Sequence, residues 1–446
     1  MKKTLLFSIL LCIAILIFLI LIRVFPKNAS LLPALLVLMI LDGYLWFSIV
    51  SRIERLRPGV RYLLTGFYWL PLILLVSSII TGIFVPFLSW QVSLRTFIPG
   101  LILTTYICKV FPIVSLVCAD LIRTFRFWGN SFTHGKGSAF GYFVRNRWIL
   151  MTGWLLGGVF FILMMLGMFW WNFNYTVRKQ TIVLPELPKS FDGLTIVQIS
   201  DIHLGSWGCP SELDKAINLV NAQKPDLIFF TGDMANYSTR DVIPFESMLK
   251  HIKSRLGIFA ILGNHDYGDY ITWTSATEKL KDMDDLISFY HRLGWKLLMN
   301  EHYILKNDRD SIAILGIQNW GMTKRFQRLG DVEEAERGVK NMDIQLLLTH
   351  DPTSWKALVC NTYRNIDVCF SGHTHGFQFG FERWGIHWSP AQYLYDQWGG
   401  LYSEPVPGSH PLYLYVNRGL GSIGYPGRIG MPPEITLFTL RREEQK

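Results

Sequence analysis

Acidic side chains are almost absent from the first 175 residues of this 446-residue chain. Only Asp42, Glu54 and Asp120 occur there beside 15 Lys and Arg, so this part carries a net charge of +12. Residues 176–446 hold 28 Lys and Arg and 31 Asp and Glu, a net charge of −3. The basic excess therefore lies in the N-terminal part, and the acidic balance of the rest argues against a nucleic-acid-binding protein.

Cysteine is scarce as well. The six cysteines are Cys12, Cys108, Cys118, Cys209, Cys360 and Cys369, and no CxxC motif occurs. The first three lie in or beside apolar stretches, and the other three are far apart in the sequence. This spacing excludes the disulfide framework of a small secreted domain.

Charge is nearly missing from five long stretches of the N-terminal part. They are Leu5–Ile22, Leu31–Val50, Leu64–Leu88, Phe97–Cys118 and Trp148–Trp171. Each is about as long as the 20 apolar residues with which a helix crosses a bilayer. The first begins MKKTLLFSIL, as a signal peptide does, but no small-residue cleavage site follows, so we expect it to be retained as a span. We expect Asp42 and Lys109 to lie near span ends and to reach the interface.

The distribution of Lys and Arg predicts the orientation of these spans. The N-terminus and the second and fourth loops carry 11 of them, against 5 on the opposite side. The first side is therefore expected to be cytoplasmic. Five spans then place the rest of a multi-pass cell-membrane protein outside the cytoplasm. The expected organisation is a transmembrane domain over residues 1–175, a linker over 176–192 and a second domain over 193–446.

Five apolar runs in the second domain each end in a loop with side chains that can bind metal. The runs and their loop residues are LTIVQISDIH (Asp201, His203), DLIFFTGDM (Asp233), GIFAILGNHD (Asn264, His265, Asp266), IQLLLTHDP (His350) and IDVCFSGHTHG (His373, His375). Continuous apolar runs of this length are typical of strands buried on both faces. Helical segments such as CPSELDKAINLVNAQKP lie between them, and this alternation predicts an α/β fold.

A single His or Asp after a strand is usually a turn or cap residue. Five strand ends of the same kind indicate more, because α/β folds place their sites at the carboxyl ends of strands. Carboxylates, imidazoles and an amide without thiolates suit Mn, Fe or Zn. Even seven of these side chains as ligands are too many for one catalytic ion with an open position. The set therefore favours two ions that share a carboxylate, an arrangement used in phosphoester hydrolysis.

The order of these blocks resembles the calcineurin-like metallophosphoesterase superfamily. The blocks are Asp201-x-His203, Gly232-Asp233, Gly263-Asn264-His265-Asp266, His350 and Gly372-His373-Thr374-His375. The resemblance covers about Leu194 to Leu440, and the tail YVNRGLGSIGYPGRIGMPPEITLFTL is similar to that of the membrane-associated bacterial branch. It implies an αββα sandwich of two mixed sheets, here preceded by an all-α transmembrane domain of about five helices.

The resemblance also implies a role for each residue. Asp201, His203 and His375 would hold one divalent ion, and Asn264, His350 and His373 the second. Asp233 would bridge them, with Mn as the expected metal and Fe or Zn as alternatives. A hydroxide between the ions would attack phosphorus in line. His265 would stabilise the phosphoryl group and protonate the leaving oxygen, and Asp266 would orient His265.

The substrate is less defined by the sequence. A membrane-embedded phosphoesterase could act on a phospholipid or a lipid A-type headgroup, as the resemblance suggests. A phosphodiesterase of nucleotides or nucleic acid and a non-catalytic metal-binding sensor are the alternatives. The segment Gly321–Gly338 could cap the site, with Lys324, Arg325 and Arg328 as phosphate-binding candidates, or it could be a solvated helix. We interpret Asp351 as a turn residue rather than a further ligand.

Overall fold

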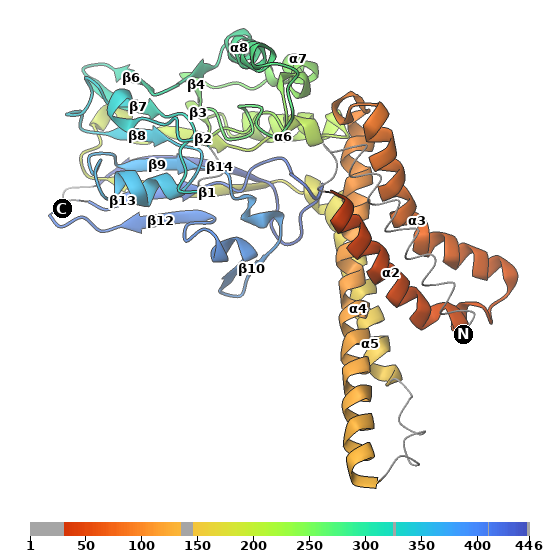
Figure 1. The fold of residues 1–446 in the computed structure, drawn as a ribbon. Helices are drawn as coiled ribbons and strands as arrows, with labels where there is room; N and C mark the ends of the chain where they lie inside the picture. The colour runs from red at the N-terminus through yellow and green to blue at the C-terminus, as the bar shows by residue number, and fades with distance from the viewer. Residues whose placement is uncertain (1–30, 135–145, 324–326, 409, 444–446) are drawn as a thin grey trace. The chain divides into compact units, whose positions relative to one another are not determined.

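The computed structural model describes residues 31–134, 146–323, 327–408 and 410–443. Figure 1 shows two compact units. The helical unit comprises the described residues up to Val85 together with Leu101–Ile162. The sheet unit comprises Pro86–Gly100 and the chain from Leu163 onward.

Four long helices in the described part are apolar enough to cross a membrane. They are α2 (Leu31–Ile53), α3 (Pro58–Phe84), α4 (Val92–His134) and α5 (Arg147–Phe169). They correspond to the last four predicted spans. The first predicted span, Leu5–Ile22, lies outside the described residues. The first turns of α4 and the last turns of α5 belong to the sheet unit.

Asp42 and Lys109 do not reach the interface, contrary to our expectation. Lys109 Nζ lies 2.6 Å from Asp42 Oδ1, and the two residues are 8% and 1% exposed. The Tyr106 hydroxyl donates to Asp42 Oδ2 at 2.8 Å. The prediction was wrong because the two side chains pair with each other between α2 and α4 instead of extending to the helix ends. Asp42 falls in the middle of α2.

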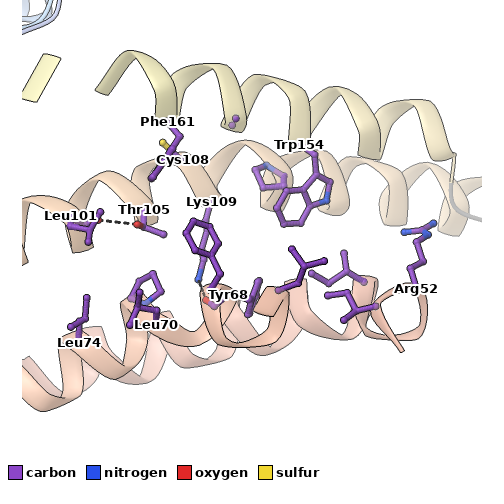
Figure 2. Close-up of a pocket in the computed structure, with 18 residues that line it drawn as sticks. Arg52, Tyr68, Leu70, Leu74, Leu101, Thr105, Cys108, Lys109, Trp154 and Phe161 are labelled. Carbon is purple, nitrogen blue, oxygen red and sulfur yellow. Dashed lines mark hydrogen bonds between the residues drawn. The ribbon is translucent and has the colours of Figure 1, made fainter. Parts of the chain in front are cut away.

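The same unit contains a cavity of about 480 Å³. Figure 2 shows its walls, which are mostly apolar side chains of α2 to α5. Lys109 and Arg52 are the basic residues that line it. The Lys109 ammonium is already paired with Asp42, so the cavity offers mainly an apolar surface.

The sheet unit is built on two six-stranded sheets. The first has the order β1 (Thr176–Leu184), β14 (Glu434–Arg442), β2 (Thr195–Ile199), β3 (Leu227–Phe230), β4 (Gly257–Ala260) and β5 (Lys296–Leu297). The second has the order β12 (Gly400–Glu404), β13 (Leu412–Val416), β9 (Val368–Ser371), β8 (Gln345–Leu348), β7 (Asp310–Gly316) and β6 (Glu301–Asn307). Both are mixed, because β14 is antiparallel to β2 and β6 is antiparallel to β7.

Helices cover the outer faces of the two sheets. They are α6 (Pro210–Ala222), α7 (Glu246–Leu249), α8 (Ala276–Leu293), α9 (Val332–Ala335) and a short π-helix over Trp355–Val359. Helices α6 and α8 pack on the first sheet, and α9 and the π-helix pack on the second. A third apolar layer, which includes Phe229, Phe370 and Phe438, fills the space between the sheets. The predicted αββα sandwich is thereby confirmed.

Residues 176–184, which we expected to begin a linker, form β1 instead. This strand pairs in parallel with β14 along its whole length, from Thr176 opposite Glu434 to Leu184 opposite Arg442. The partner lies at the far end of the chain, so no local pattern marks the pairing. The sheet therefore begins directly after α5.

Candidate active site

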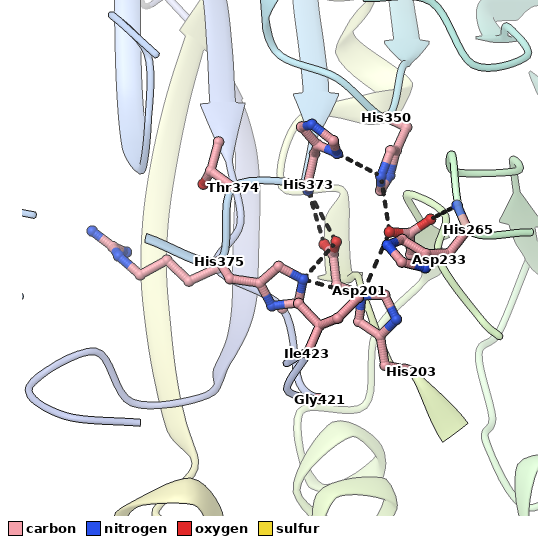
Figure 3. Close-up of polar contacts among 12 residues, drawn as sticks. Asp201, His203, Asp233, His265, His350, His373, Thr374, His375, Gly421 and Ile423 are labelled. Atoms are coloured by element: carbon pink, nitrogen blue, oxygen red, sulfur yellow. Dashed lines mark hydrogen bonds and ion pairs between the residues drawn. The ribbon is translucent and has the colours of Figure 1, made fainter. Parts of the chain in front are cut away.

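The expected site residues lie at the carboxyl ends of five strands. Strands β2, β3 and β4 are neighbouring and parallel in the first sheet, and β8 and β9 are neighbouring and parallel in the second. The loops after these strands meet at one end of the sandwich, as Figure 3 shows. Segments far apart in the sequence are brought together there.

Asp201, His203 and His375 form a first cluster whose ligand atoms lie within 4.8 Å of one another. The Nε2 atoms of His203 and His375 are 3.1 Å apart. His375 Nε2 is also 3.3 Å from Asp201 Oδ1. All three side chains are buried, so water does not screen the carboxylate.

Asp233, His350 and His373 form a second cluster of the same kind, and Asn264 joins it. His350 Nε2 lies 3.1 Å from Asn264 Oδ1, 3.2 Å from His373 Nδ1 and 3.3 Å from Asp233 Oδ2. On the other side of the ring, His350 Nδ1 is 2.7 Å from the Thr231 carbonyl. When Nδ1 carries a proton for this carbonyl, Nε2 presents a lone pair, as a metal ligand must.

Asp233 lies between the two clusters. Its Oδ2 is 3.3 Å from His350 Nε2 and 3.5 Å from His203 Nε2. Its backbone N–H donates to the carboxylate of Asp266 at 2.9 Å. One oxygen of this carboxylate therefore faces a nitrogen of each cluster, the geometry expected of a shared ligand.

The electrostatics favour binding of cations. Burial alone would raise the pKa of Asp233, but His350 and His265 outweigh it and hold the pKa well below its usual value. Burial lowers the pKa of His203 to about 3, so this imidazole is neutral at pH 7. Burial opposes the charged form of His350 too, yet the Asp233 carboxylate raises the pKa of His350 to about 10. A metal ion has to displace that proton, which couples metal binding to pH.

The backbone is left-handed at five of the expected ligands. The φ angles are 50° at Asp201, 49° at His203, 60° at Asp233, 74° at His373 and 52° at His375. Non-glycine residues adopt this conformation rarely, and such strain concentrates at functional sites. Gly372 allows the loops to approach, because a Cβ there would overlap Ser200 and Asp201.

His265 is held differently from what we expected. Its Nδ1 lies 2.8 Å from the carbonyl of Asn236, and its ring stacks on Tyr270 with centroids 3.8 Å apart. The Asp266 carboxylate instead accepts backbone N–H bonds from Asp233 and Gly263 at 2.9 Å and from Ala235 at 3.0 Å. Asp266 thus fixes the two loops, whereas the carbonyl of Asn236 orients the imidazole.

Of the three basic residues proposed to contact phosphate, the structure describes Arg328. Lys324 and Arg325 lie outside the described residues. Arg328 donates to the carbonyls of Gly321 at 2.8 Å and Met322 at 2.7 Å, so it closes its own loop. In the described part of Gly321–Gly338 the α-helix is the four-residue α9, Val332–Ala335, and not the long solvated helix considered as the alternative.

Asp351 behaves as a turn residue. Its Oδ1 accepts from the backbone N–H of Thr353 at 2.9 Å and from the Thr353 hydroxyl at 2.7 Å. Its Oδ2 is 3.6 Å from His373 Nε2.

Two tyrosines near the ligands were not anticipated. The Tyr270 hydroxyl accepts from Asn264 Nδ2 at 2.6 Å, which leaves Asn264 Oδ1 facing the second cluster. The Tyr395 hydroxyl lies 3.0 Å from His373 Nε2. Tyr270 closely follows the Asn264-His265-Asp266 block and could have been considered. Tyr395 lies in a distant loop without a sequence signal.

Comparison with known proteins agrees with this geometry. Residues 194–377 match the calcineurin-like phosphoesterase family. Residues 26–171 match a second family, described as "Probable Calcineurin-like phosphoesterase, transmembrane domain".

Individual relatives carry the same domain. The metallophosphoesterase YkuE of Bacillus subtilis is 32% identical over 269 residues, which cover 59% of this chain and 84% of YkuE. A metallophosphoesterase of Aquifex aeolicus is 26% identical over 63% of this chain and 98% of its own length. A "Transmembrane protein with metallophosphoesterase domain" of Danio rerio is 30% identical over 58% of this chain and 56% of its own length.

The chain therefore belongs to the calcineurin-like metallophosphoesterases, a family with a binuclear divalent metal centre, and it is a membrane protein that hydrolyses phosphoester bonds with the help of metal.

Proposed function

We propose that this protein hydrolyses a phosphoester bond in a membrane lipid or lipid-linked headgroup, at a two-metal site outside the cytoplasm. The observation that carries the two-metal site is the convergence of atoms that can bind a metal ion. Nε2 of His350, Nδ1 of His373 and the side-chain oxygens of Asp233 and Asn264 point at one another. A divalent cation that displaces the proton of His350 could be coordinated by these atoms together.

The donor sets fit two divalent ions. Asp201, His203 and His375 would hold the first, Asn264, His350 and His373 the second, and Asp233 would be shared. Carboxylate, imidazole and amide ligands without thiolate suit Mn best, with Fe and Zn as alternatives. When bound, such a pair makes hydroxide available as a nucleophile near neutral pH and neutralises charge on the phosphoryl oxygens.

In the metal-free chain, the His265 ring is neutral and can accept a proton. Burial lowers its pKa, so the ring is neutral at pH 7. With Nδ1–H held by the carbonyl of Asn236, the lone pair is on Nε2. We therefore expect His265 to stabilise the phosphoryl group of the substrate and to protonate the leaving oxygen. Negative charge on the substrate would favour the protonated ring and allow it to donate a proton.

A lipid-borne substrate is supported by the attachment of the site to the membrane. The ligand residues and the last turns of α5 belong to the same compact unit. Helix α5 is among the candidate membrane spans. A lipid headgroup at the bilayer surface is therefore near the site, whereas attachment to the membrane does not bring a soluble nucleotide any closer.

The proposed placement outside the cytoplasm is supported by the charge of two loops. If α2 to α5 each cross the membrane, the α2–α3 and α4–α5 loops lie on the same side of it, because two helices separate them. The chain after α5 then lies on the opposite side. Nine Lys and Arg stand in and beside these loops, against five on the opposite side, which are Arg23, Lys27, Arg95, Arg178 and Lys179. Basic loops remain in the cytoplasm. A C-terminal alkaline phosphatase fusion is expected to be active, and an inactive fusion beside a fluorescent cytoplasmic reporter fusion would contradict the orientation.

The substrate class is tested by activity profiling. The full-length protein, purified in detergent and supplied with Mn²⁺, is offered phospholipids, lipid-linked sugar phosphates and nucleotide phosphoesters in parallel. We expect turnover of a lipid phosphoester that is lost in the D233A variant. Turnover confined to nucleotides would contradict the lipid assignment and leave the metal site intact.

A further inference from the structure

A small hairpin beside the ligand clusters carries exposed apolar side chains. Strands β10 (Phe381–Arg383) and β11 (Ile386–Trp388) form it, and it projects from the body of the sheet unit in Figure 1. Trp384 at its tip is 86% exposed and Ile386 is 54% exposed. Such side chains on a projecting turn mark an interaction surface.

The tip has an unusual backbone for its residue type. Trp384 and Gly385 form the two-residue turn, with φ angles of 54° and 78°. Turns with two positive φ angles normally hold Asn, Asp or Gly. A bulky residue in this conformation is strained. The Trp384 ring nevertheless remains largely exposed, and it packs against Phe381 of the same hairpin, with centroids 5.6 Å apart. Folding of the sheet unit therefore does not explain the tryptophan.

The opposite face of the hairpin is anchored. Glu382 accepts hydrogen bonds from Arg178 of β1 and from Arg418. His387 lies 2.7 Å from Glu382 and stacks on Trp398 with centroids 4.1 Å apart. The polar face is thus fixed to the sheet unit, and the apolar side chains are held on the other face.

Hydrogen bonds connect the base of the hairpin to the end of α5. Gln378 Nε2 donates to the carbonyl of Tyr425 at 2.7 Å, and the Tyr425 hydroxyl donates to the carbonyl of Met164. The backbone N–H of Arg428 donates to the carbonyl of Gly167 at 3.2 Å. All these residues belong to the sheet unit.

The end of α5 also marks the level of the bilayer surface. The sequence there is FWWNFNY, and Trp170 is 70% exposed, which is typical of an interfacial aromatic belt. Met164 precedes Trp170 by six residues, so it lies about 9 Å further along the helix, toward the membrane interior. The loop that contacts Met164, and the hairpin bonded to that loop, are accordingly at the depth of the interface.

The hairpin is continuous with the candidate metal site. His375 of the first cluster, the exposed Phe377 and the anchored Gln378 follow one another in the segment that leads into β10. On the far side of β11, Tyr393 and Leu394 are exposed, and the next residue, Tyr395, touches His373. Apolar side chains thus flank the site on both sides of the hairpin.

We infer that this hairpin inserts Trp384, Ile386 and Phe381 into the bilayer interface and leads a lipid-borne phosphoester to the metal ligands. The occupant is the lipid surface itself, since a membrane-spanning helix and an aromatic belt stand at the base of the hairpin. Insertion does not require catalysis, whereas the delivery of substrate rests on the proposed function.

Insertion is tested with the full-length protein in lipid nanodiscs. A polarity-sensitive dye is attached to W384C in a background with Cys12, Cys118 and Cys209 replaced by Ser. The matched control is L280C on α8, where Leu280 is 67% exposed and apolar. Lipids with a spin label near the headgroup are expected to quench the dye on W384C about twofold or more, because interfacial segments lie about 5–10 Å deep in the bilayer. The dye on L280C is expected to be quenched little. Equal quenching at both positions would overturn insertion.

A second copy of the chain is the competing occupant. It would shield the dye on W384C in detergent without nanodisc lipid, and cross-linked dimers would appear. That result would also overturn the inference.

Substrate delivery is tested by a ratio of two activities. The double variant W384D/I386D should lower turnover of a vesicle-borne lipid phosphoester about tenfold more than turnover of soluble bis-p-nitrophenyl phosphate, an effect of lost interfacial burial. The control L280D should leave the ratio unchanged. An unchanged ratio in W384D/I386D would refute delivery, whereas absence of both activities in the wild type would refute the proposed function.

Discussion

The Nε2 atoms of His203 and His375 lie 3.1 Å apart, with Asp201 Oδ1 3.3 Å from the second of them. Both nitrogens are close enough to each other and to the carboxylate to bind one divalent cation. The buried Asp201 carboxylate would supply the negative charge that such an ion needs.

The first prediction removes one of these nitrogens. We expect H375A to weaken Mn²⁺ binding at least about 10–100-fold, because mutation of residues that only contact a metal ligand already lowers metal affinity by this factor. Isothermal titration of the full-length protein after treatment with chelator measures the affinity. The matched control is H291A, on the exposed side of α8. Equal Mn²⁺ affinity in H375A and H291A would remove His375 from the site.

A second prediction separates Asp266 from His265. Because the Asp266 carboxylate holds the backbone N–H groups of Asp233 and Gly263, D266A should weaken Mn²⁺ binding about tenfold, as outer-sphere changes do. The same loss is expected when D266A is combined with H265A. If Asp266 acted by orienting His265, the H265A background would mask the effect in a double-mutant cycle.

The third prediction concerns the membrane helices. K109M leaves the Asp42 carboxylate buried without its partner, which should cost about 3–5 kcal/mol of stability. D42N combined with K109M removes both charges and should restore most of that loss. Thermal aggregation of the full-length protein in detergent, followed by size-exclusion chromatography, ranks the variants. The partly exposed Arg61 supplies the control R61M, and equal midpoints for K109M and R61M would contradict a stabilising pair.

A fourth prediction is a pH dependence of stability. His410 Nε2 lies 2.7 Å from Asp367 Oδ1, and this hydrogen bond raises the pKa of His410. The folded state therefore favours the charged ring. The stability that the charged His410 contributes is fully present below its pKa in the unfolded state, about 6.5. It disappears as pH rises through the higher pKa of His410 in the folded state. The side chain is partly solvated, so the contribution should not exceed about 1 kcal/mol.

Thermal midpoints of wild type and H410Q between pH 5 and 9 provide the test. The gap between the two should be widest near the acidic end and should narrow as pH rises. H291Q serves as the control and should show a small gap at all pH values. A gap for H410Q that stays constant with pH would show that the ion pair contributes no charge-dependent stability.

The metal-ligand loops could be predicted because their signals are local. Each is an apolar strand followed at once by Asp, Asn or His, and parallel strands bring those ends to one edge. Strand β1 was missed since its partner β14 is at the far end of the chain. The Asp42–Lys109 pair was missed because the sequence does not specify which helix faces pack together. The carbonyl of Asn236 that holds His265 is a backbone group, and no residue type marks it.

Titration of the chelator-treated, full-length protein with Mn²⁺, followed by hydrolysis of bis-p-nitrophenyl phosphate, tests the two-metal site most directly. We predict that activity is absent without metal, that it saturates when two ions are bound per chain, and that D233A neither binds the second ion nor gains activity. Full hydrolysis with one ion per chain, or an active D233A variant, would contradict the shared two-metal site.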